Sequence, residues 1–209
     1  IEELRLRRGL ENIREDIRAM IPQVLECCQP KPSSFFPLLE SVLSQSRLDG
    51  DRSSLLHLLW VKTQATGLNG NCDFVRSIEA AREFIHVCGE HSPIDEGHTL
   101  EVYAALWDAS ERVGDSAGVI EGISNAIEIM ESGRLDASSF DASESLGFRC
   151  QRAVHKHRLG DLEGAKIDLL FCMEQSQRHA ASEPDESTRF CHEENAREAA
   201  ALLAKWFGQ

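Results

Sequence analysis

The chain has 209 residues, of which 42% are hydrophobic, and its 22 basic residues are outnumbered by 35 acidic ones, giving a formal net charge of -13. This composition supports a folded core and excludes a largely disordered chain. The negative charge argues against general binding to nucleic acids or to anionic membrane surfaces, because both repel an acidic protein.

The cysteines and the chain start suggest a cellular location. The seven cysteines are scattered and odd in number, which favours reduced thiols over a disulfide framework. No signal peptide is visible, and no apolar run approaches the ~20 residues of a membrane span. We therefore expect an intracellular protein, cytoplasmic or nuclear, with no membrane partner. The start at Ile1 instead of Met leads us to expect a piece of a longer protein.

The first predicted helix carries a heptad-like seam. Its apolar residues alternate steps of four and three: Leu6, Leu10, Ile13, Ile17, Met20 and Val24. Pro22 should end or kink this helix. The pattern fits either a coiled-coil-like arm or a packed terminal helix. A linker at residues 29–34 and a short apolar helix complete an N-terminal region of residues 1–50.

The next helix is predicted to lie at the centre of a core. Asp49-Gly50-Asp51 ends the preceding helix, and Ser53 or Ser54 is expected to cap the new one. From Leu55 to Val61 the sequence is apolar on nearly every helical face. We therefore expect this helix to be buried between its neighbours.

The rest of the chain repeats a pattern of helix, turn and helix. Helices are predicted at residues 74–88, 98–113, 116–130, 146–159 and 162–179, with a last helix ending near Phe207. No segment shows the strict alternation or the residue types of strands. The predicted class is all-α.

Two turns of this series are followed by similar sequences. The segment from Gly114 to Ile123 aligns with the segment from Gly160 to Leu169, each with Gly-Asp at the turn, a glycine four residues later and apolar residues beyond. Glycine provides the left-handed conformation that ends one helix, and aspartate caps the next. The segment from Arg76 to Phe84 shows the same helix pattern after a longer turn.

These repeats resemble the tetratricopeptide repeat family. The segment from Leu159 to Ala165 is similar to the turn between its paired helices, and Ala153 stands at the small position of a first helix. The resemblance implies antiparallel helix hairpins stacked as a right-handed superhelix over residues 51–182, with a capping helix at 183–209. Because the units are irregularly spaced, we expect a divergent version, and an ordinary helical bundle is the alternative.

Such a superhelix implies binding of a partner peptide or helix in a concave groove. Acidic residues far outnumber basic ones between residues 51 and 147. We predict that Glu101, Asp108 and Glu111 bind a basic ligand, the alternative being a solvated exterior. A basic stripe of Arg149, Arg152 and Lys156 is spaced to share one face, and it is expected to meet acidic groups of a partner or of a neighbouring hairpin.

The sequence contains no motif for catalysis or for a cofactor. It has no nucleophile elbow, phosphate loop or metal-binding spacing of His and Cys, so we expect no enzyme, no cofactor and no metal. The predicted function is a scaffold or adaptor that binds a protein within a larger assembly. The alternatives are a helical domain that dimerises or regulates a larger enzyme, and a helical enzyme. Self-association through the N-terminal or C-terminal helix is also predicted.

Overall fold

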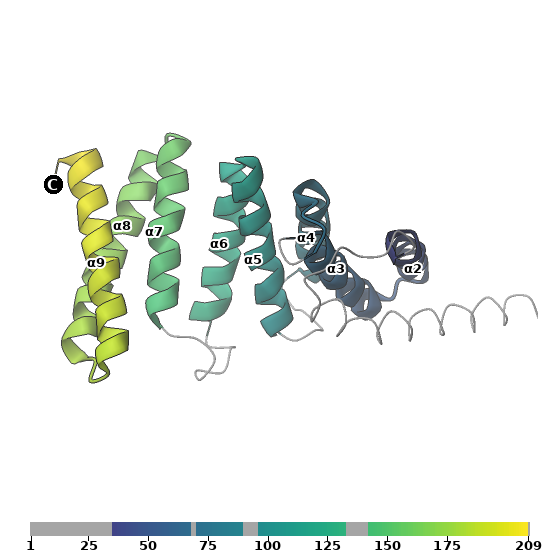
Figure 1. The fold of residues 1–209 in the computed structure, drawn as a ribbon, viewed down its shortest axis with the longest axis horizontal. Helices are drawn as coiled ribbons and strands as arrows, with labels where there is room; N and C mark the ends of the chain where they lie inside the picture. Colours follow the sequence, from purple (N-terminus) through teal and green to yellow (C-terminus); the bar gives the residue numbers. More distant parts are fainter. Residues whose placement is uncertain (1–34, 68–69, 90–95, 133–141, 209) are drawn as a thin grey trace, which may run out of the picture. The chain divides into compact units, whose positions relative to one another are not determined.

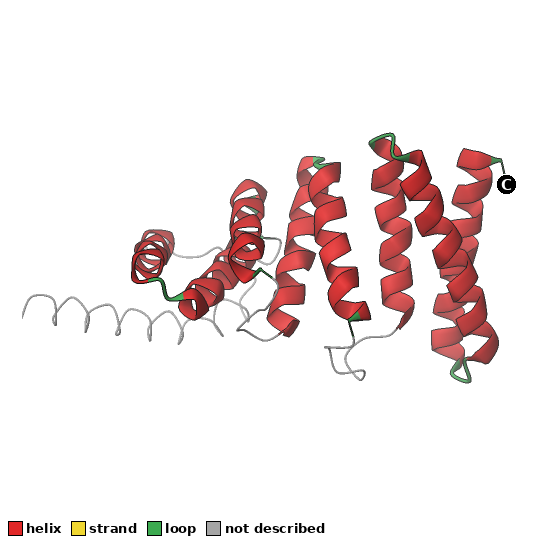
Figure 2. Ribbon diagram, turned by 180° about the vertical axis from the view of Figure 1, so that it is seen from behind, coloured by secondary structure: helices red, strands yellow, loops and turns green. Residues whose placement is uncertain are grey.

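The computed structural model describes residues 35–67, 70–89, 96–132 and 142–208, and every regular element in these ranges is an α-helix (Figures 1 and 2). The all-α class is therefore confirmed for the described residues. The predicted heptad helix lies outside them. The helices are α2 (Phe35–Asp49), α3 (Arg52–Thr66), α4 (Phe74–Cys88), α5 (Glu96–Val113), α6 (Ser116–Glu131), α7 (Ala142–Arg158), α8 (Leu162–Ser182) and α9 (Glu186–Phe207).

Aspartates cap five of these helices. Each accepts a hydrogen bond from the backbone amide three residues further on, and the capping residues are Asp51, Asp73, Asp115, Asp161 and Asp185. A cap of this kind stabilises a helix by about 1 kcal/mol. The prediction of Ser53 or Ser54 as the cap of α3 was wrong, because α3 begins at Arg52 and both serines lie inside its first turn.

Both predicted Gly-Asp breaks are confirmed. Gly114 and Gly160 adopt φ angles of +77° and +82°, in the left-handed region that favours glycine. Asp115 and Asp161 then cap α6 and α8. The chain forms two compact units, one within residues 1–113 and one within residues 114–209. The predicted division at residues 50 and 182 stays a prediction.

In the first unit, α3 is the central helix. It packs against α2, α4 and α5, and nearly all of its apolar side chains are buried, as its sequence predicted. The largest fully buried side chains of this core are Leu39, Leu43, Leu56, Leu59, Phe84 and Leu106. Each such leucine contributes roughly 1.5–3 kcal/mol by leaving water, so this cluster is what holds the four helices together.

In the second unit, α7 packs against α6, α8 and α9. Small side chains, among them Ala153 and Ala165, are completely buried and let α7 and α8 approach closely. The same core includes Ala199 and Leu203, so the C-terminal helix α9 is a packed element of this unit. Among the described helices, none combines the length and the apolar character that crossing a bilayer requires.

Candidate interaction site and a buried ion cluster

The three predicted acidic residues lie along one side of α5. Glu101, Asp108 and Glu111 are separated by seven and three residues, which places their Cβ atoms on the same helical face. Glu101 and Glu111 are exposed, and Asp108 is partly exposed. Ala104 and Ala105, on the same face, are half-buried and leave the surface between the carboxylates low. We call this surface the α5 acidic face.

One carboxylate of the α5 acidic face is held in place by the core. The indole Nε1 of Trp60, a buried residue of α3, donates a hydrogen bond of 2.7 Å to Oε2 of Glu101. Asp108 is only loosely paired, since its Oδ1 lies 3.9 Å from Nε of Arg112 in the next turn of α5. Exposed pairs at this distance contribute little, so this carboxylate keeps most of its capacity for an external cation.

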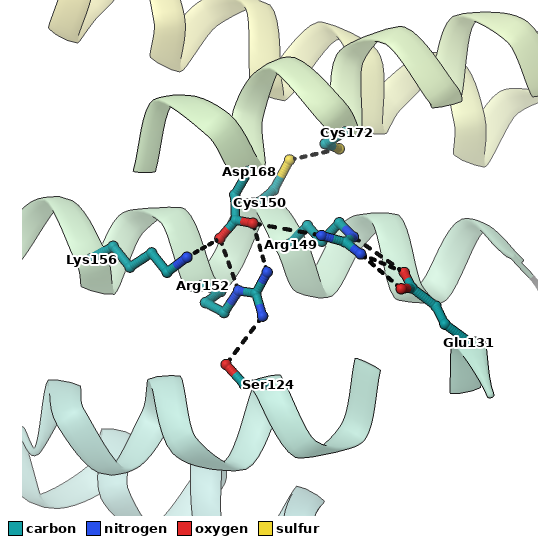
Figure 3. A network of polar contacts seen from close by, with 8 residues as sticks. All are labelled: Ser124, Glu131, Arg149, Cys150, Arg152, Lys156, Asp168 and Cys172. Atoms are coloured by element: carbon teal, nitrogen blue, oxygen red, sulfur yellow. Dashed lines mark hydrogen bonds and ion pairs between the residues drawn. The ribbon is translucent and has the colours of Figure 1, made fainter. Parts of the chain in front are cut away.

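The three predicted basic residues have a different environment. Arg149, Arg152 and Lys156 of α7 converge on the carboxylate of Asp168 in α8, whose side chain is 2% exposed (Figure 3). Arg152 binds it with two parallel bonds, Nη2 to Oδ1 at 2.6 Å and Nε to Oδ2 at 2.8 Å. Nζ of Lys156 lies 3.0 Å from Oδ2, and Nη1 of Arg149 lies 3.7 Å from Oδ1. Together with Glu131 and Ser124 these residues form what we call the Asp168 cluster.

The Asp168 cluster extends to α6. Arg149 forms a second pair, with Nη2 at 2.6 Å from Oε1 of Glu131, and its guanidinium lies 4.2 Å above the ring of Phe171. Arg152 also donates from Nη1 to the Ser124 hydroxyl at 3.1 Å. The three basic side chains are only 13–19% exposed. Their charges are therefore largely matched within the fold, at the junction of α6, α7 and α8, and their role toward a partner stays a prediction.

The charge state of Asp168 follows from this environment. Burial of the carboxyl disfavours its charged form and by itself would raise its pKa. Hydrogen bonds from Arg152 and Lys156, and the positive charges of both, outweigh burial and hold the pKa of Asp168 below its usual range. Asp168 is therefore a buried carboxylate anion at neutral pH, and the cluster depends on it.

A pair of thiols lies beside the Asp168 cluster on the same two helices. Sγ of Cys150 in α7 is 2.9 Å from Sγ of Cys172 in α8, and both residues are buried (Figure 3). The two sulfur atoms also lie 4.0 and 3.8 Å from the backbone oxygen of Asn195 in α9. The sequence analysis predicted scattered reduced thiols and did not identify this close pair.

A signal for the missing contacts was present in the sequence. In an antiparallel hairpin, residues equally far from the turn lie opposite one another. Arg152 and Asp168 are equally distant from Gly160, as are Arg149 and Phe171, and Cys150 and Cys172 are nearly so. Applying this register to the predicted Gly160-Asp161 corner would have identified the counter-ion of the basic stripe and the thiol pair.

The fold and these sites define a class: an all-helical protein with an acidic helix face in one unit and a buried ion cluster with a close thiol pair in the other. No protein-family model matches the sequence, and a search of curated proteins finds no similar chain. Its function has to be inferred from its own residues.

Proposed function

We propose that this chain is a protein-interaction module that binds a basic peptide or helix of a partner through the α5 acidic face, its hairpins being a divergent tetratricopeptide-like repeat. One observation carries the proposal: three carboxylates line one side of α5 and are exposed or partly exposed, whereas the basic stripe of α7 is neutralised inside its own unit. The surface charge available to a partner is therefore predominantly negative.

The electrostatics support a basic partner. With a net charge of -13, the chain attracts cationic segments and speeds their encounter. A single exposed ion pair contributes about 0.2–1 kcal/mol, so three carboxylates acting together provide on the order of 0.6–3 kcal/mol, or roughly three- to 150-fold in affinity. The short side chains of Ala104 and Ala105 let a partner helix approach α5 closely enough for these ion pairs to form.

The Trp60–Glu101 hydrogen bond favours binding in a second way. Because the indole is fixed in the core of the first unit, the Glu101 side chain is ordered before a partner arrives. Ordering a long side chain on binding costs about 0.5–1.5 kcal/mol, and pre-ordering removes part of that cost. The bond uses Oε2, and Oε1 remains directed away from it as a potential acceptor for a partner.

The test measures affinity for a set of 15-residue amphipathic peptides that carry Lys and Arg at helical spacing, with matched peptides in which Gln replaces these residues. The site variant combines Glu101→Gln, Asp108→Asn and Glu111→Gln. We expect the protein to select among basic peptides, and the site variant to lose about ten-fold or more in affinity at low salt. Its melting temperature should change little, because Asp108 and Glu111 make no close ion pair within the described residues and the amide that replaces Glu101 still has an oxygen that can accept the Trp60 hydrogen bond.

A matched control separates a site from simple net charge. Glu174→Gln, Glu193→Gln and Glu198→Gln remove the same amount of charge from exposed positions of α8 and α9. This control variant should lose less than about two-fold, since its carboxylates lie outside the α5 acidic face. Equal losses in both variants, or equal binding of the Gln peptides, would show that no acidic site exists on α5.

A further inference from the structure

The sulfur atoms of Cys150 and Cys172 lie close enough for a disulfide bond to form between them. The two Sγ atoms are 2.9 Å apart, and they need to approach by less than about 1 Å to reach the length of a disulfide bond. They come from two helices, α7 and α8, that pack against each other, and Figure 3 marks the contact between the two residues. Small movements of the side chains are sufficient to join them.

The chemical environment distinguishes the two sulfur atoms. The hydrogen bond from the Cys150 thiol lowers the pKa of Cys172, with help from the Ser176 hydroxyl and the positive charge of Arg149, although burial opposes the shift. The same bond, together with burial, raises the pKa of Cys150. Cys172 accepts the Cys150 hydrogen bond and lies 3.9 Å from the Ser176 hydroxyl, so this geometry favours Cys172 as the nucleophile, since thiolates are the reactive form, and Cys150 as the thiol that resolves it.

We propose that Cys150 and Cys172 are a reversible disulfide site that fastens α7 to α8. This inference does not depend on the proposed function, since none of its residues belongs to the α5 acidic face. The oxidant is a peroxide. If the two cysteines acted only as small apolar groups, alanine could replace either of them, and the close contact between the two sulfur atoms would have no role.

The reaction balances with one peroxide molecule. The Cys172 thiolate attacks one peroxide oxygen, the O–O bond breaks, and the other oxygen leaves as hydroxide, giving a sulfenic acid at Cys172. Cys150 then gives up its proton and attacks the sulfenic sulfur, so that an S–S bond forms, the S–O bond breaks and a second hydroxide leaves. With the two thiol protons, the products are one disulfide and two molecules of water.

Helix α9 determines how fast this reaction proceeds. The Asn195 oxygen of α9 lies within 4.0 Å of both sulfur atoms, and Cys150 is 2% exposed while Cys172 is completely buried. A peroxide therefore reaches the pair only when α9 moves away. Oxidation should be slower than at the exposed Cys72 and Cys191, and it should accelerate under conditions that loosen α9.

The test uses the native chain treated with hydrogen peroxide. Remaining thiols are blocked with N-ethylmaleimide, and the protein is digested with trypsin without reduction. We expect a cross-linked product that joins residues 150–152 to residues 167–178, because trypsin cuts after Arg149, Arg152, Lys166 and Arg178. Dithiothreitol should separate the two peptides. The cross-link should raise the melting temperature of the second unit by about 15 °C, as expected for a loop of this length.

Controls make both outcomes informative. Cys72→Ser and Cys191→Ser should leave the cross-link unchanged, and Cys172→Ala should abolish both the cross-link and the rise in melting temperature. Oxidation in denaturing urea should scramble the pairing among the seven cysteines. The proposal fails if Cys150 and Cys172 are still alkylated as thiols after native oxidation has been continued long past completion at Cys72 and Cys191, or if their cross-link forms only after unfolding. Peptide mapping of the unmutated chain decides this even if Cys172→Ala does not fold.

Discussion

Replacing Asp168 by asparagine tests whether the second unit depends on its buried ion cluster. Asparagine has nearly the same shape, so the packing remains while the negative charge disappears. Arg152 then keeps at most one oxygen acceptor in place of two and faces an amide NH2 that cannot accept, and Lys156 loses its ion-pair partner at 3.0 Å. Removing one member of a buried ion pair costs about 3–5 kcal/mol because the remaining charge is left without compensation.

The expected magnitude lies at or just below the low end of that range. The three basic side chains keep 13–19% of their surface exposed, and Arg149 retains Glu131, so water and a second carboxylate offset part of the loss. We expect Asp168→Asn to destabilise the second unit by about 2–3 kcal/mol. The double variant with Arg152→Met should be at least ~1 kcal/mol more stable than the sum of the single effects, because the two residues interact directly.

The assay is urea unfolding followed by hydrogen exchange and mass spectrometry. Peptides from α7 and α8 should lose protection in Asp168→Asn, and peptides from α2 to α4 in the first unit serve as the internal control. A change below about 0.5 kcal/mol, or additive effects in the double variant, would mean that the ion pairs are solvated in solution and stabilise nothing. The account of the basic stripe as an internal element would then be wrong.

Three further outcomes are expected. Because the pKa of Asp168 is depressed in the folded state, its contribution to the free energy of unfolding is complete above its unfolded pKa of about 3.9 and is lost as the pH falls through the lower folded pKa. When urea unfolding is measured from pH 7 to pH 2, Asp168→Asn should therefore show a smaller loss of stability with acid than the native chain. Gly160→Ala places a side chain at φ +82° and should cost about 1 kcal/mol in thermal unfolding, whereas Gly147→Ala, where the new Cβ meets only Asn195 at 3.5 Å, should be neutral or stabilise α7 by up to about 1 kcal/mol. Arg152→Lys keeps the charge but cannot form the two parallel bonds, so the urea midpoint should fall by about half as much as in Asp168→Asn. A midpoint equal to that of the native chain would show that charge alone matters.

Helix positions followed from the sequence wherever local chemistry determines them. The bounds of α4 agree with the prediction because Asp73 and Gly89 mark its two ends. The start of α7 was placed four residues late, since its first four residues, Ala-Ser-Glu-Ser, carry no large apolar side chain. Apolar periodicity identifies the buried part of a helix, but it does not detect a first turn that lacks large apolar side chains.

The candidate sites were predictable in part for a similar reason. Spacing along one helix identified the α5 acidic face and the basic stripe of α7, because residues three, four and seven apart share a face. It could not identify Asp168, which has the appearance of an ordinary acidic residue on the next helix. Its role comes from the register between α7 and α8, a tertiary property that one helix does not encode.

The register between α7 and α8 suggests what the buried charge of Asp168 does in the second unit: it sets the alignment of the two helices. The seam between α7 and α8 consists of small and apolar side chains such as Ala153, Ala165 and Leu169, and sliding one helix by a turn would still place apolar groups against apolar groups. The same slide would remove Asp168 from Arg152 and leave buried cations without a counter-ion, which is far more costly than a poorer apolar fit. The corner at Gly160 fixes one end of the hairpin, and the Asp168 cluster fixes its alignment two turns further along. In this arrangement the ion cluster selects one packing among several of similar apolar burial, and it brings the sulfur atoms of Cys150 and Cys172 into contact as a direct consequence.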